Sequence, residues 1–302
     1  MNKAELIQQR LPKLLDLMSP CRLCPRNCLV NRLAGETGFC RSTDRIKVAS
    51  WAHHRGEEPP ISGTLGSGTI FASNCTLGCI FCQNFPFSQL GGGKEFSPDK
   101  LADIFSKLAD EGIHNFNFVT PTHVIPLLLE AWLGASRKAQ ELPIVYNCSG
   151  YESLEVLSLL EGIVDIYIPD IKYADNQVAG QLSQCSDYVE NNRATLIEMH
   201  RQVGELKLDN NGIATHGLII RHLVLPHSLA GSRESFNWLK NTLGTQVHIS
   251  LMSQYFPAHK AHHHEMINRP ITADEYVEVL ELVENLGFEN VWAQDPDEKG
   301  GA

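Results

Sequence analysis

The sequence predicts an α/β protein in which a parallel sheet curls into a partial (β/α)6 TIM-like barrel, preceded by a small cysteine-rich module. Short apolar or β-branched runs alternate with amphipathic segments from about residue 68 onward. These runs are apolar almost throughout, which is typical of parallel strands buried on both faces. About six such units suggest an open or partial barrel, with ligands at the carboxyl ends of the strands.

Local signals indicate where these elements begin and end. Ser97 is a candidate N-cap for a helix that ends at Gly112, and Thr272 with Glu275 forms a capping-box signature for a last helix ending at Gly287. The predicted strands are residues 69–73, 116–120, 143–148, 163–170, 217–225, 246–252 and 289–293.

The chain divides into three parts by composition. Residues 41–67 look irregular, and Gly63, Gly66 and Gly68 predict a flexible approach to the first barrel strand. The predicted parts are an N-terminal helix and cysteine-rich module (1–67), a barrel core (68–293) and a flexible polar tail (294–302).

Composition and charge narrow the class of protein. The 302 residues carry a formal net charge of -10, which disfavours nonspecific binding to nucleic acid or to anionic membranes. No apolar run approaches the ~20 residues of a membrane span, and the N-terminus lacks the apolar region of a signal peptide. We therefore expect a cytoplasmic protein that has no nucleic-acid or membrane partner.

The cysteines carry the sharpest functional signal. There are nine, and seven of them lie between Cys21 and Cys82 in two clusters. An odd number in a chain without an export signal argues against a disulfide framework and favours metal binding. Cys75, Cys79 and Cys82 follow the first predicted barrel strand, and three thiolates at this spacing can wrap one face of a [4Fe–4S] cluster. Such a cluster has four irons, so one iron would keep an open position for a ligand. A structural zinc knuckle is the alternative.

The pattern CxxxCxΦC, with Phe81 before its last cysteine, resembles the signature of the radical S-adenosylmethionine (SAM) superfamily. The resemblance covers roughly residues 68–293. It implies that SAM binds the open iron and is reductively cleaved to a 5′-deoxyadenosyl radical, which abstracts hydrogen. The residue at the position of Phe81 is implied to lie near the adenine.

The resemblance also implies SAM contacts at the ends of later strands. The second strand ends where many members carry a Gly-Gly-Glu-type motif; this chain lacks that motif, and only the position is carried over. For the loop with Thr120, Thr122 and His123, the alternative is an ordinary helix start. For Asp170 and Lys172 the alternative is a surface ion pair, and for Arg221 it is an outward-facing charge. The candidate residues are Thr120, Thr122, His123, Asn147, Ser149, Asp170, Lys172 and Arg221.

Several segments together resemble one branch of the superfamily. The sequences VTPTH, YNCSGYE, IPDIKY, RHLVLP and LMSQYFPAHKA are similar to the branch related to pyruvate formate-lyase activating enzymes. This likeness implies hydrogen abstraction from a glycine of a partner protein, with a small-molecule substrate as the alternative. An electron donor such as flavodoxin or ferredoxin is implied as a further partner.

The N-terminal module offers a second metal site and sets this chain apart from a plain activase. Four thiolates in twenty residues suit a closed tetrahedral zinc site or a fully ligated second Fe–S cluster, and spacing does not choose between them. These thiolates belong to Cys21, Cys24, Cys28 and Cys40. The rival to an enzyme is a non-catalytic iron–sulfur, zinc or electron-transfer protein, which would more naturally have complete ligation at both sites.

Overall fold

A ten-stranded sheet forms the centre of the computed structural model, which describes residues 1–294. The spatial order is β10-β9-β8-β6-β5-β4-β2-β1-β3, and β7 pairs with β8. The predicted tail, apart from residue 294, lies outside the described residues. The strands are β1 (Ile46–His54), β2 (Ser67–Ala72), β3 (Lys94–Phe96), β4 (Phe116–Val119), β5 (Ile144–Cys148), β6 (Ile166–Pro169), β7 (Lys207–Leu208), β8 (Ala214–Leu223), β9 (His248–Met252) and β10 (Val291–Ala293).

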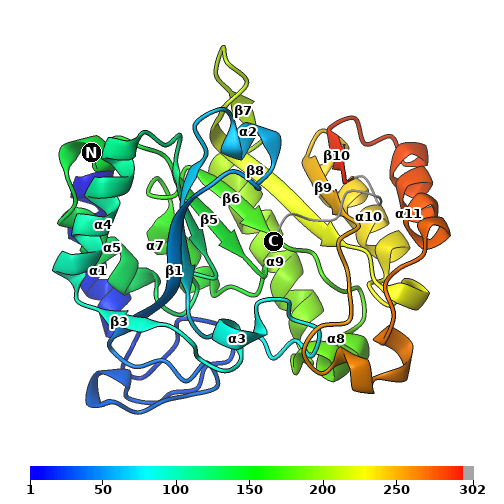
Figure 1. The fold of residues 1–302 in the computed structure, drawn as a ribbon, viewed down its shortest axis with the longest axis horizontal. Helices are drawn as coiled ribbons and strands as arrows, with labels where there is room; N and C mark the ends of the chain where they lie inside the picture. Colours follow the sequence, from blue (N-terminus) through cyan, green and yellow to red (C-terminus); the bar gives the residue numbers. More distant parts are fainter. Residues whose placement is uncertain (295–302) are drawn as a thin grey trace.

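Seven of these strands run parallel and confirm the seven strands predicted from the sequence. They are joined pairwise in the order β2, β4, β5, β6, β8, β9 and β10. The sheet curves into a partial barrel, and within residues 1–294 its edge strands β3 and β10 are not paired with each other (Figure 1). The fold is thus the partial TIM-like barrel that the strand–helix alternation predicts.

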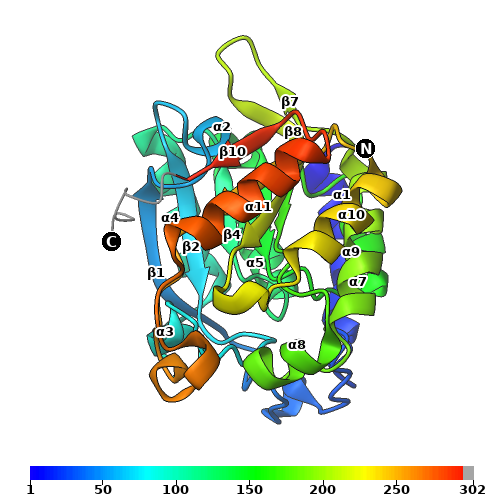
Figure 2. The same ribbon diagram turned by 90° about the vertical axis from the view of Figure 1, so that its right-hand side faces the viewer.

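Helices cover the outer side of the curved sheet. Contacts between neighbours follow the order α4, α5, α1, α7, α9, α10 and α11, and Figure 2 shows part of this arc beside the strands. No helix within residues 1–294 has the length and apolar character needed to cross a membrane. The α-helices are α1 (Lys3–Asp16), α2 (Pro59–Ser62), α3 (Phe85–Ser88), α4 (Pro98–Glu111), α5 (Ile125–Leu133), α6 (Arg137–Gln140), α7 (Leu154–Leu160), α8 (Asn176–Ser183), α9 (Tyr188–Val203), α10 (Ser232–Leu243) and α11 (Ala273–Asn285). The 3-10 helices are η1 (Arg32–Ala34), η2 (Pro226–Ser228), η3 (Ala261–His263) and η4 (Glu265–Ile267).

Two helix starts confirm the predicted capping residues. The Ser97 side chain accepts from the amide of Lys100 at the start of α4. Thr272 and Glu275 form both bonds of a capping box at the start of α11. Each cap satisfies backbone donors that the first helical turn leaves without a partner.

The two faces of the sheet are filled differently. Phe116 and Phe118 of β4 pack on Phe105 of α4, with ring centroids 5.3 and 5.7 Å apart, so alternation turns Asn117 to the inner side. We call the space enclosed by the inner side of the curved sheet the lumen. A separate buried apolar cluster there contains Ile61, Val145, Ile166, Ile168, Leu206, Ala214 and Ile219.

The segment expected to be irregular, residues 41–67, contains the strand β1 and the short helix α2, which corrects the prediction in part. It forms β1, which runs antiparallel to β2 and places Trp51 opposite Ile70. Gly66 adopts a φ of +82°, and a Cβ there would stand 2.7 Å from the carbonyl oxygen of His54. This glycine therefore allows close backbone packing at the turn before β2, where the glycines predicted a turn.

The loops at the carboxyl ends of the parallel strands gather on one face. In Figure 1 the cysteine-rich residues 21–40, helix α3 and helix α8 all lie at the lower end of the barrel. Helix α1, by contrast, packs on α5 and α7 in the outer layer. The two groups of cysteines therefore meet at the barrel mouth.

Candidate metal centre at the barrel mouth

The cysteine loop, residues 75–82, follows β2 directly and is held by the C-terminal end of α8. The amides of Gly78 and Ile80 each donate a 2.9 Å hydrogen bond to carbonyl oxygens at that helix end. The side-chain amide carbon of Gln184 also packs against Gly78, where a Cβ would stand 2.9 Å from it. The loop conformation thus depends on a helix that lies about one hundred residues further along the chain.

Each thiol of the cysteine loop has one hydrogen-bond partner of its own. Partners of this kind stabilise a thiolate and orient it toward a metal. The contacts are Leu77 N to Cys75 Sγ (3.4 Å), Ser183 Oγ to Cys79 Sγ (2.9 Å), and Cys82 Sγ with Ser88 Oγ (3.1 Å).

A buried cation lies beside these thiols. The ammonium of Lys172 pairs with Asp170 at 2.5 Å, and each side chain is only 18% exposed. Burial alone would lower the pKa of Lys172, but Asp170 and Cys79 raise it above its ordinary value. Burial raises the pKa of the Cys79 thiol to about 11, although Lys172 opposes the increase. Burial, and then Cys79, also raises the pKa of Cys75. Binding a cationic metal would deprotonate these thiols and offset that cost.

The donor set of the cysteine loop fits an iron–sulfur cluster with one open position. Cys148 and Cys185 lie elsewhere, and the Cys185 thiol donates to Asp187 at 3.5 Å. No three His, Cys, Asp or Glu side chains within residues 1–294 are arranged around a single ion. Three thiolates that bind different irons need not converge on one point.

Two predicted SAM-contact residues point into the mouth without partners of their own. Asn147 is 8% exposed. Neither the side-chain amide of Asn147 nor the hydroxyl of Ser149 makes a hydrogen bond within residues 1–294. The hydroxyl of Tyr188 lies 2.8 and 3.1 Å from the carbonyl oxygens of Ser149 and Asp170. This contact draws the ends of β5 and β6 together beside the cysteine loop.

Phe81 and Thr120 have more constrained surroundings. Phe81 is buried and packs edge-on against Tyr255, with ring centroids 5.7 Å apart. Thr120 adopts a positive φ of 57°, and its amide donates to the carbonyl oxygen of Asn147 at 2.8 Å. A non-glycine residue in the left-handed region is uncommon and is often found at functional sites.

Thr122 and His123 already have structural partners. The Thr122 hydroxyl donates to Glu152 at 2.8 Å, and Nε2 of His123 bonds to the carbonyl oxygen of Ser73 at 2.8 Å. Both side chains are 1% exposed. They lie on the side of the mouth nearest the cysteine-rich module.

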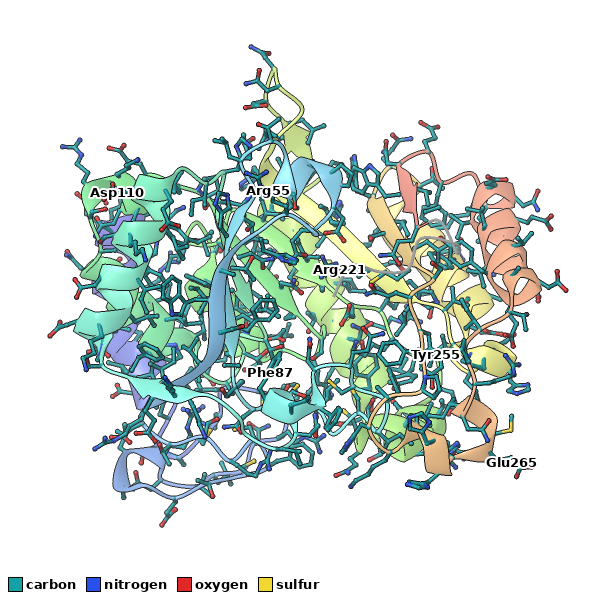
Figure 3. All side chains as sticks on the ribbon, viewed as in Figure 1. Arg55, Phe87, Asp110, Arg221, Tyr255 and Glu265 are labelled. Carbon is teal, nitrogen blue, oxygen red and sulfur yellow. The ribbon has the colours of Figure 1, made fainter. Side chains whose placement is uncertain are left out.

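Arg221 is neither an outward-facing charge nor unpaired. It lies inside the curved sheet (Figure 3), where its guanidinium donates two 2.7 Å hydrogen bonds to Glu58 and a further bond to Glu57. Burial favours the neutral form of Glu58, but Arg221 outweighs it and lowers the carboxyl pKa below its ordinary value. Two carboxylates thus neutralise the guanidinium, and sequence reasoning missed both because they precede Arg221 by more than 160 residues.

The four N-terminal thiols line one small cavity together with Thr76 of the cysteine loop. Burial raises the pKa of Cys24, and the neighbouring Cys40 and Cys21 add to the increase. Such a set of thiols suits zinc and iron–sulfur clusters alike. The side chains are not yet grouped around a single ion, so a bound metal would draw them together.

Arg26 joins the two groups of cysteines, which no sequence signal indicated. Its guanidinium donates to the carbonyl oxygens of Thr76 (2.9 Å) and Gln184 (2.6 Å). It also stacks on Phe39 at 3.5 Å. One side chain of the module therefore contacts both the cysteine loop and the helix end that holds it.

Glu152 is a second buried group that the sequence did not reveal. It accepts 2.8 Å hydrogen bonds from Thr122 and Tyr146, and it is 2% exposed. Burial raises its pKa to about 7, although both hydroxyls oppose the increase.

The fold and the cysteine-bearing mouth place this chain among partial-barrel proteins. Its structure is similar to that of HydG, a maturase of the [FeFe]-hydrogenase, with a TM-score of 0.52 and 10% sequence identity. The match covers 75% of this chain and 51% of HydG, so the chain spans about half of the HydG chain. At this identity the likeness shows a shared fold.

Two curated relatives come from Methanocaldococcus jannaschii. The uncharacterized protein MJ0674 is 30% identical over 300 residues, which is 96% of this chain and 82% of that protein. The uncharacterized protein MJ0808 is 26% identical over 177 residues, 53% of this chain and 51% of that protein. No family model matches the sequence. The chain belongs to the same family as MJ0674.

Proposed function

We propose that this protein is a radical SAM enzyme whose [4Fe–4S] cluster is held by Cys75, Cys79 and Cys82. The observation that carries the proposal is a loop with three hydrogen-bonded thiols, directly after the first parallel strand, at the mouth of a partial barrel. The fold shared with HydG supports it. The cluster, when bound, supplies the electron that cleaves SAM to a 5′-deoxyadenosyl radical.

The chain's own residues bind and orient SAM in this proposal. Asn147 and Ser149 offer an amide and a hydroxyl without other partners, and Phe81 provides an apolar surface for the adenine. Thr120 presents a strained backbone at the neighbouring strand end. Thr122, His123 and Arg221 have structural partners, so they would support the pocket from behind.

The Asp170–Lys172 pair has an electrostatic role in the proposal. The Lys172 ammonium stays charged and faces the thiols, so it would balance part of the negative charge of three thiolates. Asp170 holds that ammonium in place at 2.5 Å.

The branch related to pyruvate formate-lyase activating enzymes supplies the finer proposal. The hydrogen would come from a glycine of a partner protein, with a small molecule as the alternative substrate. Reduced flavodoxin or ferredoxin would deliver the electron, in the cytoplasm. The N-terminal part, residues 1–67, would hold a second metal through its thiols beside the barrel core.

Anaerobic reconstitution tests the enzyme. The chain is loaded with iron and sulfide, reduced with dithionite and given SAM, and 5′-deoxyadenosine is measured. We expect product from the wild type and none above background from Cys79→Ser. If wild type and Cys79→Ser yield the same amount, the protein is a metal or electron carrier and the proposal fails.

A further inference from the structure

His123 is fixed at the boundary between the barrel and the cysteine-rich module. It follows β4, and its side chain is 1% exposed. Its backbone carbonyl oxygen accepts a 2.7 Å hydrogen bond from Arg32 of the module. Arg32 is itself buried and also donates to the carbonyl oxygen of Thr43. These contacts fix the backbone at His123 against the module, and the bond between the ring and Ser73 fixes the ring itself.

The hydrogen bonds of the ring decide its tautomer. A carbonyl oxygen only accepts, so the 2.8 Å contact with Ser73 makes Nε2 of His123 the donor. With its proton on Nε2, the neutral imidazole carries a lone pair on Nδ1. That nitrogen is buried and has no partner within residues 1–294. A buried acceptor without a partner is costly, so it calls for a ligand.

His123 lines the same small cavity as the four N-terminal cysteines. Cys21, Cys24 and Cys40 are buried there, with exposures of 7%, 8% and 9%. Cys28 is more exposed than these three cysteines, and a four-coordinate centre with His123 has no place for it. Three buried cysteines and a histidine whose Nδ1 has no other partner thus line a common cavity.

We propose that Nδ1 of His123 is a ligand of the N-terminal metal centre, together with Cys21, Cys24 and Cys40, and that Cys28 lies outside the coordination sphere. The inference rests on the second metal site of the proposed function and names its ligands. It replaces the four-cysteine set expected from spacing.

General properties of metal sites support this ligand set. A ligating histidine usually donates its other ring N–H to a backbone carbonyl or a carboxylate, which fixes the ring and raises its basicity. His123 has this arrangement through Ser73. Three thiolates with one imidazole form a common closed tetrahedral set. Such a centre would also link the module to the barrel, because His123 belongs to the barrel and the cysteines belong to the module.

The 302-residue chain tests the proposal in a Cys75→Ser, Cys79→Ser, Cys82→Ser background, which leaves the N-terminal site as the one proposed to bind metal. Metal content identifies the ion. For zinc, X-ray absorption counts sulfur and nitrogen ligands; for iron, pulsed EPR detects coupling to histidine nitrogen. His123→Asn and Cys28→Ser are compared with His222→Asn, a buried histidine with both ring nitrogens already bonded.

With His123 and Cys28 both intact, we expect X-ray absorption to show three sulfur ligands and one nitrogen ligand for zinc. For iron, we expect pulsed EPR to show coupling to a histidine nitrogen. His123→Asn should weaken metal binding at least about tenfold, as loss of even an outer partner does, whereas Cys28→Ser and His222→Asn should keep it. Four protein sulfurs without nitrogen would overturn the proposal, and this holds even if His123→Asn does not fold. SAM cleavage plays no part in these readings, so they stand whether or not the enzyme proposal fails.

Discussion

Replacing Glu152 with glutamine tests how burial controls charge beside the barrel mouth. Burial raises the pKa of this carboxyl from its ordinary 4.5 to about 7. The folded state therefore binds this proton more tightly than the unfolded state does. The contribution of protonated Glu152 to the free energy of unfolding is fully present below pH 4.5 and is lost as the pH rises through 7. One pKa unit corresponds to about 1.4 kcal/mol, so ionising Glu152 costs about 3 kcal/mol more in the folded state than in the unfolded state.

Glu152→Gln removes the charge but keeps a group that can bond to Thr122 and Tyr146. The free energy of unfolding of the variant, relative to wild type, should rise by about 2–3 kcal/mol between pH 5 and pH 8.5. Urea denaturation followed by circular dichroism, under anaerobic conditions and at equal metal content, measures this difference. Glu155→Gln is the matched control, because that carboxylate is 51% exposed. A wild-type-to-variant difference that does not change with pH would refute the reasoning.

Four further substitutions test other parts of the fold. Arg221→Met strands two buried carboxylates and should cost about 3–5 kcal/mol in urea denaturation; a cost below 1 kcal/mol would mean that the pairs are solvated. Gly66→Ala forces a Cβ against the carbonyl of His54 at positive φ, so thermal unfolding should show a loss of about 1–3 kcal/mol, and an unchanged midpoint would contradict the packing. Thr272→Ala removes a capping box and should cost about 1 kcal/mol; no loss would show that the helix end is held elsewhere. Arg26→Met should lower iron retention in the cysteine loop while metal content at the N-terminal thiols stays constant, and equal losses at both would argue for general unfolding.

The parallel core could be predicted because its strands are buried on both sides. Residues such as Ile166 and Val145 belong to apolar runs that identify a strand without reference to its partner. The strand β1 carries no such run, because only Ile46 and Val48 are buried and its other residues are half-buried or exposed. Its pairing with β2 depends on contacts such as Trp51 with Ile70, which only the assembled sheet reveals.

In the candidate site, too, local sequence features could be predicted and contacts between distant segments could not. Cys75, Cys79 and Cys82 lie within eight residues, so their spacing is a local signal. The partners of Arg221 and the contacts of Arg26 join segments far apart in the sequence, and each depends on how the sheet curls. Sequence spacing therefore identified the thiols, whereas the charges and hydrogen bonds around them required the structure.

The direction of β1 decides which end of the barrel the chain after it covers. Because this strand runs against β2, the chain that follows it arrives at the amino ends of the parallel strands, where α2 lies in Figure 1. There Ile61 joins the inner apolar cluster, so side chains fill the lumen toward that end. The cysteines lie at the opposite end, so in the proposed function a substrate would meet the reacting atoms at the carboxyl ends of the strands.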